Sequence, residues 1–222
     1  MKVMDASELY DPEFRKLIKS KKPTVIIPVG SLEQHGAHLP ITTDSDIVTE
    51  VASRLAKKCG FIVFPTINYG ISFEHSPLFN TSVTATALEI ILSNIAASLV
   101  ENGVTRIIIL NGHHRNAQVL GTYGLSYWHF MKHEFDHAGF VETSIMLAIS
   151  DKVKMKKAKK GLITKGLSKK EIQRINKLST ERGGFPKVAK NGVWGDPTGA
   201  TKKDGEKFLA EIVRNLAKEC QT

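Results

Sequence analysis

The chain has 222 residues, of which 41% are hydrophobic, 24% charged and 7% aromatic. This composition is typical of globular proteins, and a chain of this length buries roughly 70% of its unfolded surface without needing disulfides to fold. The two cysteines, Cys59 and Cys220, form no CxxC pair, which argues against a disulfide framework and favours a reducing, cytoplasmic setting. The sequence shows no signal-peptide pattern and no apolar run of about 18 residues, so we expect neither export nor a membrane span.

The formal net charge of +9 comes from one lysine-rich segment. Residues 151–190 contain 14 lysines and arginines against 3 acidic residues. The core of this segment lacks aromatic side chains that could stack on bases, so we interpret it as a solvated, partly helical surface. Attraction of an anionic substrate is the alternative interpretation. We do not expect a nucleic acid or a membrane as partner.

Strands and helices alternate along the chain. In order, we expect a helical opening, a strand at 24–29, a helix at 46–58, a strand at 61–64, a long loop to about 84, a helix at 86–102, a strand at 106–110 and a closing helix at 203–220. Alternation of this kind predicts βαβ units. We therefore expect residues 1–222 to form a single three-layer α/β/α domain around a mostly parallel sheet.

Polar clusters follow two of the predicted strands. The first strand leads into Glu33, His35, His38 and Asp44, and the strand at 106–110 leads into His113. Because the carboxyl ends of parallel strands meet at one edge of a sheet, we expect these residues to converge. Carboxylate oxygens and imidazole nitrogens together suit Zn²⁺, Mn²⁺ or Fe²⁺ better than Ca²⁺. Taken singly, Glu33 could instead cap a helix and His38 could be a buried structural histidine.

Three further histidines, His129, His133 and His137, repeat every four residues. On a helix this repeat would line one face and imitate a metal site. We do not interpret it as a separate site.

Five motifs resemble those of the creatininase family of metal-dependent amidohydrolases. They are PVGSLEQHGAHLPITTD (28–44), GISFEH (70–75), LNGHHRN (110–116), HAGFVETS (137–144) and GVWGDPTGATKKDGE (192–206). The resemblance covers most of the chain. It implies a compact α/β domain that assembles into homo-oligomers, from dimers to hexamers.

The resemblance also implies a role for each matching residue. Glu33, Asp44 and His113 would hold one metal ion, and His35 with a bridging Asp44 would hold a second. His137 and Glu142 would act as acid or base beside the substrate, which would be contacted by Ser72, Glu74, His75, His114 and Arg115. Arg115 stands where creatininase has a carboxylate ligand of the second ion, and a guanidinium cannot be a ligand because it stays protonated.

The implied chemistry is cleavage of a non-peptide C–N amide bond by metal-activated water, with Fe²⁺ favoured over Zn²⁺ or Mn²⁺. Within the family we favour deformylation of a formylaminopyrimidine ribonucleotide in riboflavin and deazaflavin biosynthesis, because Arg115 and the lysine-rich segment could attract its phosphate. Creatinine hydrolysis and a peptidase that matures a peptide-derived cofactor are the alternatives. A non-catalytic nucleotide- or RNA-binding module is the alternative of another class.

Overall fold

A parallel sheet of five strands forms the centre of the protein. The computed structural model describes residues 4–121, 123–134 and 136–220. The strand order is β1-β3-β2-β4-β5, and every pairing is parallel. The strands are β1 (Met4–Asp5), β2 (Val25–Val29), β3 (Ile62–Val63), β4 (Ile107–Asn111) and β5 (Gly124–Ser126). This arrangement confirms the predicted α/β class.

Strands β2 and β4 pair along their whole length and end together. Their register places Val29 opposite Asn111, so the chain leaves the sheet at the same edge in both strands. All five residues of β2 are buried, as expected for a hydrophobic, β-branched run in a parallel sheet covered on both faces. Successive side chains of a strand point to opposite faces, and Ile26 accordingly packs on one helical layer while Val25 and Ile27 pack on the other.

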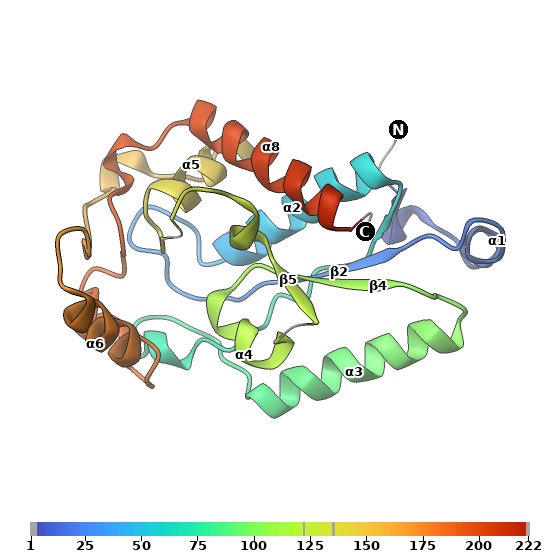
Figure 1. The fold of residues 1–222 in the computed structure, drawn as a ribbon, viewed down its shortest axis with the longest axis horizontal. Coiled ribbons are helices and arrows are strands. Elements are labelled where there is room, and N and C mark those ends of the chain that lie inside the picture. The colour runs from blue at the N-terminus through green and yellow to red at the C-terminus, as the bar shows by residue number, and fades with distance from the viewer. Residues whose placement is uncertain (1–3, 122, 135, 221–222) are drawn as a thin grey trace.

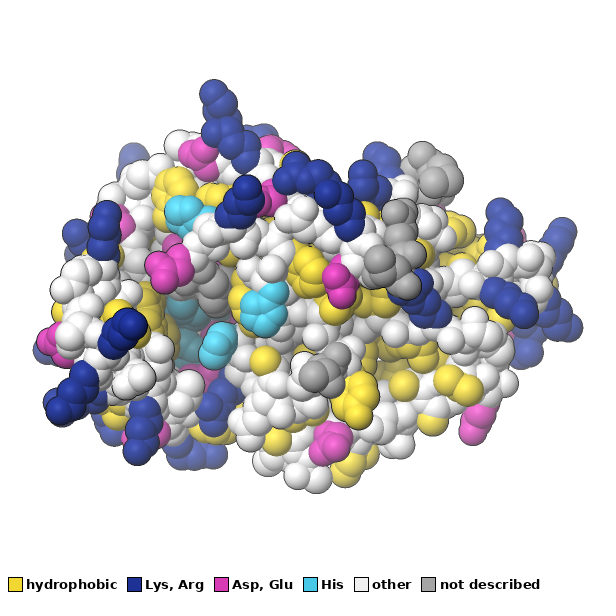
Figure 2. Space-filling view, viewed as in Figure 1, with side chains coloured by type: hydrophobic (Ala, Val, Ile, Leu, Met, Phe, Trp, Pro, Cys, Tyr) yellow, Lys and Arg dark blue, Asp and Glu magenta, His cyan; other side chains and the backbone are white. Residues whose placement is uncertain are grey.

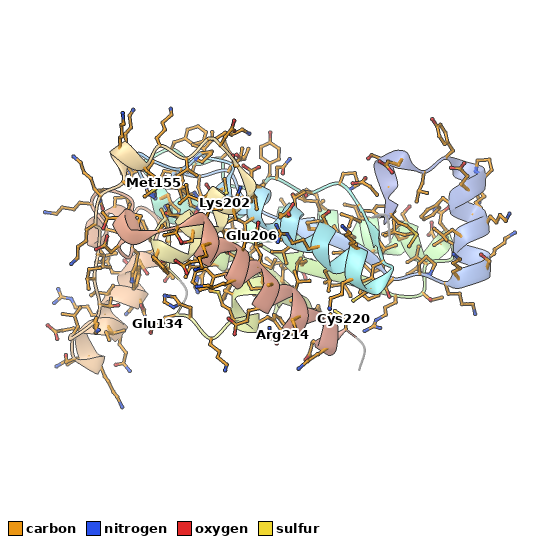
Figure 3. The ribbon with its side chains drawn as sticks, turned by 90° about the horizontal axis from the view of Figure 1, so that it is seen from above. Glu134, Met155, Lys202, Glu206, Arg214 and Cys220 are labelled. Atoms are coloured by element: carbon orange, nitrogen blue, oxygen red, sulfur yellow. The ribbon has the colours of Figure 1, made fainter. Side chains whose placement is uncertain are left out.

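Helices cover both faces of the sheet (Figure 1). One layer contains α2 (Thr43–Cys59), α5 (Phe140–Ile149) and α8 (Lys202–Glu219), and the opposite layer contains α1 (Asp11–Lys21), α3 (Ala85–Glu101) and α4 (Ala117–Leu120). Figure 3 shows Lys202, Glu206, Arg214 and Cys220 along α8, which packs against α2 and α5. Arg54 of α2 donates a hydrogen bond of 2.7 Å to Glu206 and ties α2 to α8.

The lysine-rich segment forms short helices joined by loops, in agreement with the sequence interpretation. It contains the 3₁₀ helix η5 (Met155–Lys157) and the α-helices α6 (Lys169–Ser179) and α7 (Phe185–Val188). Ser168 and Glu171 form a capping box that starts α6. Every lysine and arginine between 151 and 190 is exposed, which confirms the solvated surface.

The remaining 3₁₀ helices lie in connecting segments. They are η1 (Ala6–Glu8), η2 (Phe73–His75), η3 (His114–Asn116), η4 (Tyr127–Phe130) and η6 (Pro197–Gly199). Within the described part of the chain, no helix is both long and apolar enough to cross a membrane.

The main difference from the sequence prediction is the start of α2. The helix begins at Thr43 rather than at Asp46, so Asp44 lies in its first turn and not in a loop. The Thr43 hydroxyl donates a 2.7 Å hydrogen bond to the Pro40 carbonyl, and acidic residues in a first turn favour a helix start. Strands β1 and β5 were not predicted, because two or three residues carry no readable periodicity.

The close approach of α8 to α5 depends on Gly205. A methyl group at this position would overlap the carbonyl oxygen of Ser144. We expect Gly205→Ala to lower the free energy of unfolding by about 1–3 kcal/mol, the usual cost of overpacking, as measured by urea denaturation. Gly199→Ala is the matched control, because nothing lies within 4 Å of a Cβ there. Equal midpoints for the two variants would contradict the role of this contact.

Candidate metal centre

The polar residues that follow β2 and β4 meet at one edge of the sheet. Glu33 and His35 lie in the loop after β2, Asp44 lies in the first turn of α2, and His113 follows β4. All four side chains are buried, with at most 4% of each residue exposed. The structure therefore brings together the four residues that the sequence proposed as metal ligands.

Asp44 stands between two groups of candidate ligands. Its Oδ1 atom lies 3.1 Å from His35 Nε2, and its Oδ2 atom lies 3.0 Å from His113 Nδ1. Glu33, Asp44 and His113 form one group whose ligand atoms all lie within 4.8 Å of one another, and His35, Asp44 and Glu142 form a second. A carboxylate that faces both groups has the geometry to bridge two ions.

Both imidazoles present the nitrogen that a metal needs. His35 Nδ1 donates to the Glu33 carbonyl oxygen at 3.1 Å, and His113 Nε2 donates to the Ile71 carbonyl oxygen at 2.7 Å. The opposite nitrogen of each ring is thereby directed at the carboxylates. Metal-binding histidines are typically oriented in this way, with the second N–H fixed by a backbone carbonyl.

The charge at this edge fits a divalent cation. Glu33, Asp44, Glu74 and Glu142 are buried, and each has one carboxylate oxygen that accepts no hydrogen bond from the described residues. Burial opposes a charge on His35, but the Asp44 carboxylate raises its pKa to about 10. Burial likewise opposes a charge on His113, yet Glu33 and Asp44 raise its pKa well above the ordinary value. A divalent ion would supply the positive charge that these protons otherwise provide.

Glu142 reaches the second group from the first turn of α5. Its Oε2 atom accepts a hydrogen bond of 2.6 Å from the Ala138 N–H and lies 3.7 Å from His35 Nε2. Ala138 has a positive φ of 52°, which is unusual for a residue with a side chain. Asp136, which the sequence analysis did not select, accepts the Val141 N–H at 3.0 Å and so caps this turn of α5.

A second row of side chains adjoins the carboxylates. His75 Nε2 lies 3.0 Å from Glu33 Oε1, and the Gln34 amide nitrogen contacts His75 Nδ1 at 2.9 Å and His137 Nε2 at 3.1 Å. Burial lowers the pKa of His137 well below its ordinary value, so the ring is neutral at neutral pH. Sequence reasoning did not select Gln34, and its place inside the EQH triplet was the only available signal.

These residues open into a cavity of about 420 Å³. Figure 2 shows histidines gathered at a hollow in the surface. Glu74, His75 and His114 line the cavity, whereas Ser72 and Arg115 are not among its lining residues. Ser72 is fully buried, and the Arg115 guanidinium lies 4.6 Å from the centre of the Phe73 ring.

Most of the other lining residues were not predicted from the sequence. The aromatic ones are Trp128, Phe185 and Trp194, and Asn176, Ser179 and Thr180 come from the end of α6. Trp194 belongs to the GVWGD motif, but no motif marks the α6 residues. Among the described residues, no lysine or arginine lines the cavity.

The histidine repeat does not form one helical face. Helix η4 ends at Phe130, and His137 lies beyond it. His133 packs against the rings of Phe140 and Phe208, while His137 lines the cavity. This placement agrees with the interpretation that the repeat is not a site of its own.

A family comparison agrees with the geometry. The model of the creatinine amidohydrolase (creatininase) family matches residues 7–220. The chain belongs to the creatininase family. It is therefore a creatininase-family amidohydrolase, and the binding-module alternative loses its main support.

Relatives of known name carry two different activities. The mycofactocin precursor peptide peptidase of Mycobacterium ulcerans (strain Agy99) is 33% identical over 227 residues, which cover 88% of this chain and 84% of the relative. The creatinine amidohydrolase of Pseudomonas putida is 27% identical over 183 residues, 64% of this chain and 70% of the relative. A crystal structure of creatininase superposes with a TM-score of 0.83 at 24% identity, covering 99% of this chain and 97% of that one. This likeness confirms the fold.

Metal binding should strengthen as pH rises. Without metal, His35 holds its proton up to a pKa of about 10, and burial raises the pKa of Glu142 to about 8, so both groups are protonated at neutral pH. An ion must displace these protons, and its apparent affinity should increase about tenfold per pH unit for each proton displaced. Titration calorimetry with Zn²⁺ or Mn²⁺ between about pH 6 and about pH 8, in buffers of different ionisation enthalpy, measures both quantities. An affinity independent of pH over this range would contradict the interpretation.

Proposed function

We propose that this chain hydrolyses an amide bond of a peptide-like substrate with the help of divalent metal ions. Glu33, Asp44 and His113 would hold one ion, and His35 with Asp44 would contribute to a second. Related solved structures are titled as a Zn-Zn type creatininase and as a manganese creatininase, so we place Zn²⁺ or Mn²⁺ ahead of the Fe²⁺ favoured by the sequence. When bound, such ions activate a water molecule and polarise the carbonyl of the scissile amide.

The protein itself supplies proton transfer and orientation. His137 is neutral and lines the cavity, so it can accept the proton released by the attacking water and pass it to the leaving nitrogen. Gln34 contacts both His137 and His75 and fixes the orientation of their rings. Glu74 and His75 close the metal side of the cavity, and His114 stacks on Trp128 at its wall.

The lining of the cavity carries the choice of substrate. Six acidic residues face it and no described lysine or arginine does, so a phosphate group would meet repulsion there. The aromatic and neutral walls suit an uncharged amide or one with a free amine, as in a short peptide. The similarity to a mycofactocin precursor peptide peptidase supports the same choice. We therefore place the peptidase alternative ahead of the deformylation first expected.

The arrangement of Arg115 also counts against the deformylase. Its guanidinium covers the Phe73 ring, and the basic residues of 151–190 are exposed to solvent. Neither source of positive charge therefore lines the place where the phosphorylated substrate would bind. Assembly into a homo-oligomer stays a prediction from the family resemblance, and sedimentation velocity tests it.

One assay separates the candidate substrates. The metal-loaded protein is incubated in parallel with a panel of short peptides, with creatinine and with the formylaminopyrimidine ribonucleotide. Peptide cleavage is followed by mass spectrometry, creatine formation by chromatography and formate release enzymatically. We expect peptide cleavage. Release of formate alone would return the deformylase to first place, and turnover of creatinine alone would favour creatininase activity.

The role of His137 is tested on whichever substrate is turned over. We expect His137→Gln to lower kcat by about 10²- to 10⁴-fold, the usual contribution of a general acid–base, while the metal content stays at the wild-type level. His129→Gln is the matched control, because His129 is exposed and does not line the cavity. Equal kcat values for the two variants would exclude proton transfer by His137.

A further inference from the structure

The second group of ligands lacks a carboxylate from the loop after β4. Arg115 occupies the position at which the family resemblance places that carboxylate, and its guanidinium lies over the Phe73 ring at 4.6 Å. Arg182 lies over the same ring at 5.0 Å. His35 and Asp44 alone would give the second ion two protein ligands, whereas catalytic zinc sites usually have three.

Glu142 stands where the third ligand is needed. It comes from α5, on the other side of the centre from the β4 loop, and is only 1% exposed. Its ligand atom lies within 4.8 Å of those of His35 and Asp44, and Oε2 lies 3.7 Å from His35 Nε2. The buried Oε1 atom accepts no hydrogen bond from the described residues.

The backbone around Glu142 holds the carboxylate in place. The Ala138 N–H donates a 2.6 Å hydrogen bond to Oε2, and Asp136 caps the turn of α5 from which Glu142 extends. A ligand fixed by neighbouring hydrogen bonds loses little conformational entropy when an ion binds.

We propose that Glu142 is a ligand of the second metal ion and replaces the carboxylate that is absent at position 115. This assignment rests on the proposed metal-dependent function. It changes the role of Glu142 from proton donor to ligand, and it leaves proton transfer to His137. The chain would thus form a two-ion centre with the second carboxylate supplied by α5.

The test counts bound ions rather than turnover. Wild-type protein and the variants Glu142→Gln, Asp44→Asn and Glu134→Gln are freed of metal, reloaded with Co²⁺ or Zn²⁺ and analysed by elemental analysis. We expect about two ions per subunit in the wild type, about one in Glu142→Gln, and none in Asp44→Asn, which loses the bridge. Glu134→Gln is the matched control, since Glu134 also lines the cavity but belongs to neither ligand group, and it should keep two ions.

A cysteine variant gives direct evidence of ligation and does not depend on the stability of Glu142→Gln. If position 142 ligates the ion, Glu142→Cys loaded with Co²⁺ should show thiolate-to-cobalt charge-transfer absorption in the near ultraviolet. Two ions retained in Glu142→Gln, or cobalt bound to Glu142→Cys without this absorption, would overturn the assignment. One ion per subunit in the wild type would overturn it as well and leave a one-ion hydrolase. Absence of metal from the wild type would reject the proposed function itself.

Discussion

The structure depends on the burial of several negative charges at one edge of the sheet. Moving a carboxylate out of water costs several kcal/mol unless positive charge compensates for it. Glu33, Asp44 and Glu142 are all nearly inaccessible to solvent, and within the described residues the neighbouring positive charge comes from imidazoles. A group of this kind is costly as a purely structural feature. It becomes economical when a divalent cation is bound.

The parallel sheet explains why these charges can be gathered from distant parts of the chain. Strands β2 and β4 end in register, so the loops after Val29 and Asn111 start side by side although they are about eighty residues apart. The early start of α2 then directs Asp44 toward both groups of ligands. Helix α5 approaches from one helical layer and adds Glu142. Rigid elements thus hold each ligand, which keeps the geometry fixed before any ion binds.

The sequence predicted the sheet, its main helices and the four central ligands, because these follow from local patterns. Apolar runs mark the strands, and polar clusters follow them directly. The sequence could not show that the Arg115 side chain turns onto Phe73, nor that Glu142 lies beside His35, because both facts depend on tertiary packing. Gln34 was missed for the same reason, since its partners His75 and His137 come from other motifs.

Net charge proved a poor guide to the substrate, and the reason is spatial. The basic side chains of 151–190 point to solvent, where salt screens their field over roughly 8 Å. The same segment presents Asn176, Ser179 and Thr180 to the cavity, so the side of it that a substrate would meet is neutral. A substrate is selected by the groups that it contacts after it loses its water, and here those groups are acidic, aromatic or uncharged. The lysine-rich surface can therefore influence solubility or encounter, but the chemistry of the cavity sets what is bound.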